Sequence, residues 1–332
     1  MGWSRSKRYE IDGSTLFPSL LSLALIVICI RAEAQPAPSD QSSTREVISN
    51  MQEFEKRMGF PKTKNFRKAD PNRPAYLLCF STGLLQLPDS YEGLWPSPVN
   101  EKGCQMDGRK HDLFFYRVEA IAGNAKITPA LAEATDERKT VVVAHEDFHV
   151  AMDSLPAPVA EAGITLVGFL VAAEFAKEQF GEESSQYRNL SQESELFQRK
   201  AALIKAYHTR LRLLYESVRR GGTSRAAALA EKQRVFDELG EKCREILPEP
   251  HSFNRCPPVF NNAGLAFDMT YANYYPDLYQ IYLDHNRSLH EMIEMLKGLV
   301  TDSKAVGKHQ AIESFFHRPA PEPQQAASDS IR

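Results

Sequence analysis

This 332-residue sequence has few residues of some types and little net charge, and it lacks some common motifs. These features exclude several classes of protein and of metal site. Tryptophan occurs twice and cysteine five times. The formal net charge is only −3 and no long basic run is present, so we expect no nucleic-acid partner. No C-x-x-C pair occurs, which argues against a zinc site built from cysteines. With 42% hydrophobic and 25% charged residues, the chain can instead bury the core of a globular domain.

The longest apolar run near the N-terminus extends from Leu16 to Ile30, after a short basic region and before an A-x-A motif ending at Ala34. This is the plan of a secretory signal peptide, so we expect residues 1–34 to be removed and the protein to be exported, periplasmic or secreted. An uncleaved anchor is the alternative, but the run is short for a bilayer and is broken by Pro18. We expect no membrane span after cleavage.

Cysteine usage agrees with export. Cys29 leaves with the signal peptide, and the four remaining cysteines permit three pairings. We favour Cys79–Cys104 and Cys243–Cys256, because each pair closes a modest local loop in an oxidising compartment. Four buried thiols are the alternative.

The rest of the chain is expected to hold one domain with flexible ends. Residues 35–48 are polar and rich in proline and serine, which predicts a flexible linker. Residues 301–332 predict a largely disordered tail. The domain between them, residues 49–300, divides into an irregular α/β part (49–130), two helices that carry the candidate site (131–185) and a helical part (190–300).

Apolar spacing predicts a mainly helical α+β fold, with a small sheet near the N-terminus and a helical bundle toward the C-terminus. The runs "PAYLLCF" and "HDLFFYRVEAI" predict strands. Apolar residues recur every three or four positions from Ile204 to Val218, which predicts a helix ending at Gly221. Thr223 or Ser224 can cap a second helix that completes a hairpin. Further helices are expected over 45–58 and, as two helices, over 261–299.

A metal-binding pattern stands in the middle of the chain, in the string "HEDFH" from His145 to His149. Histidines four residues apart lie on one face of an α-helix, one turn apart, where both can bind one cation. Thr135 or Asp136 can cap this helix. The valines at 141–143 favour a strand instead, but a buried helix tolerates them.

The pattern predicts one Zn²⁺ per chain with a third ligand from the next helix. In H-E-x-x-H sites the glutamate, here Glu146, is not a ligand and takes the proton of the water that the metal activates. A catalytic zinc usually has three protein ligands. Prolines after the first helix allow the second to turn back, so that Glu161 completes a His₂Glu set, with Glu174 as the alternative. The competing interpretation, a surface helix with solvated histidines, is disfavoured by the apolar segments on both sides.

Beyond this motif the chain resembles a known family, the predicted bacterial aminopeptidases, which are zinc peptidases of the zincin type. The resemblance rests on "AEAGITLVG", on the hairpin "RKAALIKAYHTRLRLLYESV" and "EKQRVFDELGEKCREI", and on "FNNAGLAFDMTYANYYPDLY". It covers roughly residues 115–300. Ala160 and Ala162 replace an asparagine and a serine of the family pattern, which bears on substrate preference rather than on the ligands. The resemblance implies a zincin-like fold, a peptide substrate, the ligands His145, His149 and Glu161, and Glu146 as the base.

Other residues have candidate roles. Tyr271 is the candidate that steadies the oxyanion of the tetrahedral intermediate, with Tyr116 as the alternative, although either could be a packed tyrosine. Asn261 and Asn262 either bind substrate backbone or brace a turn. An aminopeptidase must also hold the substrate's ammonium group with carboxylates, for which Glu119 and Asp268 are candidates that no spacing selects.

The sequence therefore favours a zinc metallopeptidase, and an aminopeptidase by resemblance. One alternative is another zinc hydrolase, such as an amidase of cell-wall peptides. The other is a non-catalytic secreted metal-binding protein. Glu146 argues against the latter, because a purely structural metal site does not need that glutamate.

Overall fold

Helices make up most of the computed structural model, which describes residues 38–248 and 259–317. All of these residues belong to one unit of the chain, Pro36–Arg332. The predicted mainly helical architecture with a small sheet is confirmed. The helices are α1 (Pro38–Arg57), α2 (Pro129–Glu133), α3 (Asp136–Met152), α4 (Ala157–Phe180), α5 (Ser185–Arg219), α6 (Arg225–Arg244), α7 (Asn262–Ala272), α8 (Tyr275–Asp284), α9 (Leu289–Val306) and α10 (Lys308–Phe316).

The sheet is antiparallel, with the strand order β2-β1-β5. Its strands are β1 (Tyr76–Gly83), β2 (Trp95–Pro96) and β5 (His111–Val118), and β3 (Val99–Asn100) pairs separately with β4 (Gly103–Cys104). The register places Leu78 opposite Tyr116 and Phe80 opposite Phe114. Because alternate residues of a strand point to the same side, these four large side chains share one face of the sheet.

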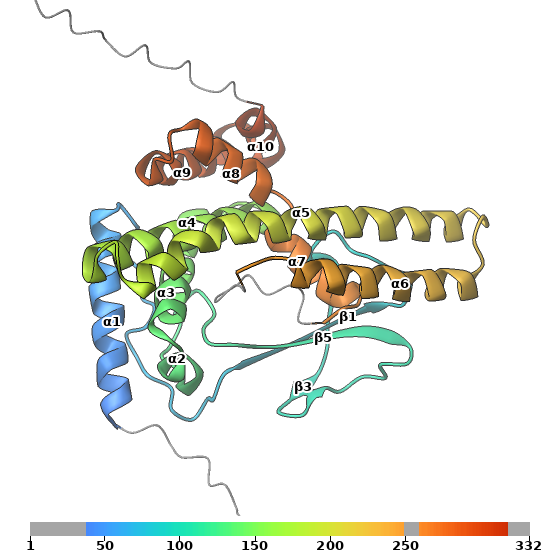
Figure 1. Cartoon of the computed structure of the whole chain (residues 1–332), viewed down its shortest axis with the longest axis horizontal. Helices are drawn as coiled ribbons and strands as arrows, with labels where there is room; N and C mark the ends of the chain where they lie inside the picture. The colour runs from blue at the N-terminus through green and yellow to red at the C-terminus, as the bar shows by residue number, and fades with distance from the viewer. Residues whose placement is uncertain (1–37, 249–258, 318–332) are drawn as a thin grey trace, which may run out of the picture. The chain divides into compact units, whose positions relative to one another are not determined.

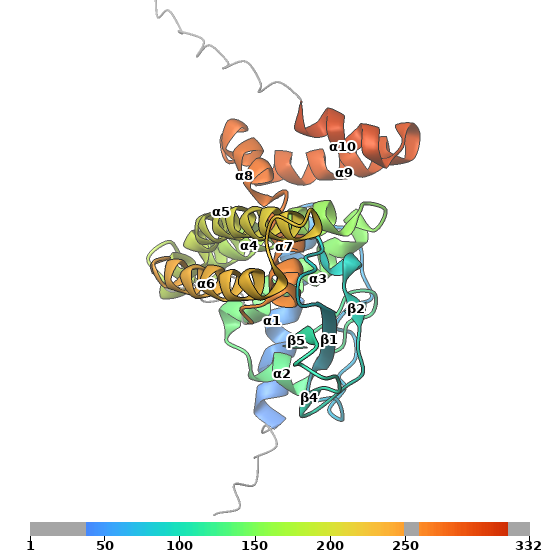
Figure 2. The same ribbon diagram turned by 90° about the vertical axis from the view of Figure 1, so that its right-hand side faces the viewer.

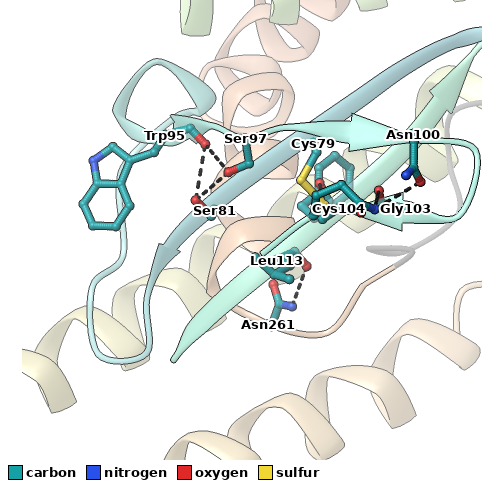
Figure 3. Close-up of a disulfide and its surroundings, with 11 residues drawn as sticks. Cys79, Ser81, Trp95, Ser97, Asn100, Gly103, Cys104, Leu113 and Asn261 are labelled. Carbon is teal, nitrogen blue, oxygen red and sulfur yellow. Dashed lines mark hydrogen bonds between the residues drawn. A yellow bond between two sulfur atoms is a disulfide. The ribbon is translucent and has the colours of Figure 1, made fainter. Parts of the chain in front are cut away.

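A disulfide between Cys79 and Cys104 ties β1 to β4, as Figure 3 shows, which confirms this predicted pair. Close to it, Asn261 Nδ2 donates a hydrogen bond of 2.9 Å to Leu113 O and so joins the start of α7 to β5. Cys256, the predicted partner of Cys243, lies outside the described residues. So does the predicted signal peptide, residues 1–34.

Helix α4 is the core of the domain and contacts α3, α5, α7, α8 and α9. Ile164, Phe169 and Val171 are fully buried in it. The helix is long and apolar enough to cross a membrane by length and composition, but 94% of that apolar stretch is buried inside the protein. The sequence predicted a buried helix here, and the burial explains why its apolar residues do not follow one stripe.

The helices lie in layers around α4 and α5. In Figures 1 and 2, α8, α9 and α10 lie on the side of these two helices away from the sheet. Helix α7 contacts α5 on one side and both β1 and β5 on the other. Helices α5 and α6 form the predicted hairpin, in which Gly221 adopts a φ of 77° and Ser224 caps α6 by accepting from Ala227 N.

The two ends of the domain are more helical than predicted. The expected linker, 35–48, overlaps α1, because Thr44, Ile48 and Met51 form a buried face of that helix. The expected tail, 301–332, overlaps the end of α9 and all of α10. Ala311 and Phe315 of α10 are buried. Packing against the rest of the domain stabilises segments whose own composition predicts little order.

The two helices expected over 261–299 are three in the structure. Pro276 lies at the start of α8, a position where its missing N–H costs no hydrogen bond, so it begins a new helix after α7. Asn286 and Arg287 adopt positive φ angles of 55° and 59° and separate α8 from α9. One break was expected in this range, and these two local breaks divide it into three helices.

Candidate metal centre

Helix α3 carries both histidines of the motif. The side chain of Thr135 caps it by accepting a hydrogen bond from Arg138 N. The valines at 141–143 are buried in the core, which explains why a helix tolerates them. His145 and His149 lie one turn apart, with ring centroids 5.0 Å from each other. The predicted helical presentation of the two imidazoles is confirmed.

Helix α4 brings Glu161 to the same point. The chain turns at Pro156, and Glu161 follows in the early turns of α4. Glu161 Oε2 lies 3.4 Å from His145 Nε2 and 3.7 Å from His149 Nε2. One ligand atom from each of the three residues lies within 4.8 Å of the other two, so they form a possible metal site. Glu174, the alternative ligand, is exposed and takes no part in this group.

The spacing of these atoms fits a small tetrahedral cation. Donor atoms about 2.0–2.1 Å from zinc at tetrahedral angles are about 3.4 Å apart. The contacts of 3.4 and 3.7 Å from Glu161 to the histidines match that spacing. Glu161 Oε2 is buried and has no aligned hydrogen bond among the described residues. A cation at this point would satisfy a buried oxygen that is otherwise costly to desolvate.

Two of the candidate ligands, His149 and Glu161, have shifted pKa values that favour the protonation states able to bind metal. Burial lowers the pKa of His149 to about 4; His145 adds to the decrease and Glu161 opposes it. Burial alone would raise the pKa of Glu161, but contacts with His145, His149 and the Tyr91 hydroxyl more than offset it, and the pKa is lowered. His149 is therefore neutral and Glu161 anionic at neutral pH, as metal ligands must be.

Glu146 lies beside the ligands and lines the same cavity. Burial raises its pKa to about 7; Glu161 and Asp147 add to the rise, and His145 and Arg138 oppose it. A carboxylate whose pKa is close to the working pH is an effective acceptor and donor of a proton. This environment suits the predicted role of Glu146 as a general base.

A cavity of about 310 Å³ opens beside these side chains, and both candidate tyrosines line it. The ring centroid of Tyr271 is 6.4 Å from that of His145. Burial raises the pKa of Tyr271 well above 10 and also raises that of Tyr116. Both hydroxyls therefore stay protonated at neutral pH and can donate hydrogen bonds.

Tyr91 is a residue of the site that the sequence did not reveal. Its hydroxyl donates a hydrogen bond of 3.1 Å to Glu161 Oε1, across 70 residues of sequence. Thr270 Oγ1 accepts from Tyr91 N at 2.8 Å, and His208 Nε2 lies 3.0 Å from Pro88 O, so this segment is fixed from two helices. Tyr91 begins an irregular 3₁₀ turn, Tyr91–Gly93, whose sequence carries no periodic signal.

Arg138 is a second residue that was missed, although the spacing contained a signal. It precedes His145 by two helical turns and therefore lies on the same face of α3. Its Nε and Nη2 atoms donate to the two carboxylate oxygens of Glu119 at 3.0 and 2.9 Å. Both residues line the cavity, where they form a bidentate ion pair.

The two carboxylates considered for the substrate's ammonium group are both engaged by cations. Glu119 is held by Arg138, and Asp268 Oδ2 lies 3.1 Å from Lys200 Nζ. Asp268 does not belong to the lining of the cavity. The structure therefore places Glu119, but not Asp268, in the lining of the cavity, and Glu119 is held there in an ion pair with Arg138.

The two asparagines brace the fold. The side chain of Asn261 caps α7 by accepting from Gly264 N at 3.0 Å. Asn262 Nδ2 donates to Leu84 O at 3.1 Å and to Gln86 O at 2.9 Å, while its Oδ1 accepts from Tyr215 at 2.8 Å. Of the two roles considered, the structure supports the bracing of a turn.

Fold and site together define a mainly helical protein with a candidate His₂Glu metal centre beside a buried carboxylate. The family model described as "Putative aminopeptidase" matches residues 140–311, and this chain belongs to that family. The matched segment, more than half of the chain, contains both histidines and Glu161. No curated protein and no solved structure matches the chain. Membership of this family suggests a peptidase function.

Proposed function

We propose that the protein is an exported, zinc-dependent metallopeptidase that cleaves peptide bonds, and that it acts as an aminopeptidase. The observation that carries the proposal is the convergence of His145, His149 and Glu161 within 4.8 Å, with Glu146 lining the same cavity. Family membership supports the peptidase class. The donor set of two imidazoles and one carboxylate supports zinc as the metal.

The residues of the site divide the work of hydrolysis between them. His145, His149 and Glu161 would hold the ion, and a bound zinc would supply Lewis acidity toward the scissile carbonyl and a water molecule. Glu146 takes the proton of the attacking water and returns it to the leaving amine. Tyr271 donates a hydrogen bond to the carbonyl oxygen as negative charge develops there.

Two substitutions separate metal binding from catalysis. We expect the wild-type protein to hold about one zinc per chain and Glu161→Ala to lose most of it. Glu146→Gln should retain zinc but lower kcat by about a hundredfold or more, because the proton acceptor is lost. Zinc content is measured by elemental analysis and turnover with aminoacyl-amides and short peptides.

Glu174→Ala is the matched control, since Glu174 is an exposed glutamate on the same helix as Glu161. It should leave both zinc content and activity unchanged. Full activity in Glu146→Gln, with zinc bound, would exclude the mechanism.

Export is tested separately by expressing the full chain and recovering it from the culture medium and the cell envelope. We expect the exported protein to begin at Gln35, because the A-x-A motif ends at Ala34. N-terminal sequencing identifies the first residue. An N-terminus that still includes the apolar run would indicate an anchor instead of a signal peptide.

A further inference from the structure

We infer that the cavity beside the candidate metal centre is a specificity pocket for one bulky, uncharged, apolar side chain adjacent to the scissile bond. The inference rests on the proposed peptidase function and adds the class of substrate. It is carried by three features of the cavity, namely its wall, its charge and its size.

The wall of the pocket is one face of the sheet. Leu78 and Phe80 of β1 and Tyr116 and Val118 of β5 all line the cavity. In the antiparallel register Leu78 lies opposite Tyr116, so these side chains belong to the same face. Leu77, which immediately precedes Leu78 in sequence, does not line the cavity. Within β1 and β5, alternate residues therefore point into the pocket, and the residues between them point to the other face of the sheet.

Aromatic packing holds this wall in place before any substrate arrives. The ring centroid of Phe267, from α7, lies 4.4 Å from that of Phe114 and 5.9 Å from those of Phe80 and Tyr116. Phe267 also lines the cavity. Because these rings support one another, an apolar side chain entering the pocket meets a surface that is already formed. Ile121, which is 40% exposed, adds an apolar residue to the lining.

Away from the candidate metal ligands and Glu146, the charged residues of the lining leave no net charge for a substrate side chain to pair with. Apart from the three candidate metal ligands and Glu146, the charged lining residues are Glu119 and Arg138. They neutralise each other through hydrogen bonds of 3.0 and 2.9 Å. A lysine or glutamate side chain in this pocket would lose its hydration without gaining an opposite charge. An uncharged side chain pays no such penalty.

The size of the cavity, about 310 Å³, limits what it can hold. It is near the lower end of the range for ligand pockets, roughly 300–1,000 Å³. One large side chain with the adjoining peptide group fits such a volume better than a long segment of substrate. We therefore expect selection at a single position next to the cut.

The test uses the zinc-loaded full chain and a set of peptides that differ at one position on each side of the bond. We expect the observed cleavage sites to have Leu, Ile, Met, Phe or Tyr at one fixed position. Peptides with Lys or Glu there should be cleaved on the order of tenfold to a hundredfold more slowly. Mass spectrometry of the products identifies the cut and its rate. Equal rates for apolar and charged residues would overturn the inference.

Two variants locate the preference in the pocket. Leu78→Lys places a cation on the lining, so the preference should shift from apolar toward acidic residues. Leu77→Lys, on the other side of the same strand, should leave the preference unchanged. Leu78→Ala keeps the wall apolar and enlarges the pocket, so this variant should favour Trp over Leu. It tests the pocket even if Leu78→Lys fails to fold. Identical preferences in Leu78→Ala and the wild type would contradict the assignment.

Binding distinguishes failure of this inference from failure of the proposed function. Two hydroxamates, one with an isobutyl and one with an aminobutyl side chain, are titrated against the zinc-loaded protein by calorimetry. If no peptide is cleaved but the isobutyl compound binds at least tenfold more tightly, the pocket stands and the peptidase proposal fails. Equal affinities would overturn the pocket whether or not peptides are cleaved.

Discussion

The hydroxyl of Tyr91 donates a hydrogen bond of 3.1 Å to Glu161 Oε1, while Oε2 of the same carboxylate faces the two histidines. One oxygen of Glu161 is thus fixed by the segment that precedes β2, and the other is directed toward the candidate metal position. Residues that hold a metal ligand in orientation contribute to metal affinity although they do not touch the ion.

Tyr91→Phe should therefore weaken zinc binding while leaving the fold intact. Loss of such a partner typically lowers metal affinity by about 10- to 100-fold. The measurement is a competition titration against a chelator, with circular dichroism as the check on folding. Unchanged affinity in Tyr91→Phe would show that Glu161 is oriented by its helix alone.

Tyr271 and Tyr116 can be separated by their effects on turnover. If Tyr271 donates to the developing oxyanion, Tyr271→Phe should lower kcat by about a hundredfold and leave zinc content unchanged. Tyr116 is in contact with the Arg138 guanidinium, so Tyr116→Phe should have a smaller effect on kcat. Steady-state kinetics of the two variants decide between the two tyrosines. A larger loss of kcat in Tyr116→Phe than in Tyr271→Phe would assign the stabilisation of the oxyanion to Tyr116.

The stability of the metal-free protein should depend on the ionisation of Glu146. Burial raises the pKa of Glu146 from 4.5 to about 7 in the folded protein. Its contribution to the free energy of unfolding is therefore fully present below about pH 4.5 and is lost as the pH rises through about 7. Glu146→Gln has no such ionisation, so it should be more stable than the wild type above pH 7.

The measurement is urea unfolding of both metal-free proteins between pH 4.5 and 8. His149 acts in the opposite sense, because burial lowers its pKa from 6.5 to about 4 and its contribution is lost as the pH falls. Both proteins contain His149, so its contribution cancels when the free energy of unfolding of Glu146→Gln is subtracted from that of the wild type at each pH. Parallel curves would mean that Glu146 titrates normally in the folded protein.

Asn65 connects helix α3, which carries the two histidines, to the main chain at Asn124 and Ala125. Its Nδ2 donates to Glu146 O at 2.9 Å and to Asp147 Oδ1 at 2.8 Å, and its Oδ1 accepts from the main chain of Asn124 and Ala125. Because Asn65 is 2% exposed, its removal leaves several buried polar groups without partners. Asn65→Ala should lower the free energy of unfolding by about 3 kcal/mol or more.

Asn50→Ala is the matched control for Asn65→Ala, because Asn50 is exposed on α1. It should change stability by no more than about 0.5 kcal/mol. Chemical denaturation followed by tryptophan fluorescence measures both variants. Similar losses in the two would show that Asn65 makes no special contribution.

The sequence by itself determined the features that depend on local spacing. Histidines four residues apart lie on one helical face wherever that helix forms, and the Thr135 cap and the break at Pro156 are also local signals. The apolar runs that form β1 and β5 and the short loop between Cys79 and Cys104 are local signals as well. The helical pair of histidines, the two candidate strands and one disulfide could therefore be predicted without tertiary information, whereas the packing of α4 against α3 decided between Glu161 and Glu174 as the third candidate ligand.

Only the tertiary structure decided which distant side chains meet. The contacts of Tyr91 with Glu161 and of Asn65 with Asp147 span 70 and 82 residues, and no periodic pattern connects their ends. The helices at 38–57 and 308–316 likewise form because their buried faces find partners that their composition does not disclose. Local spacing determines the face of a helix on which a residue lies, whereas packing determines what that face contacts. The wall of the cavity depends on packing, because its side chains come from β1, β5 and α7, which are far apart in sequence.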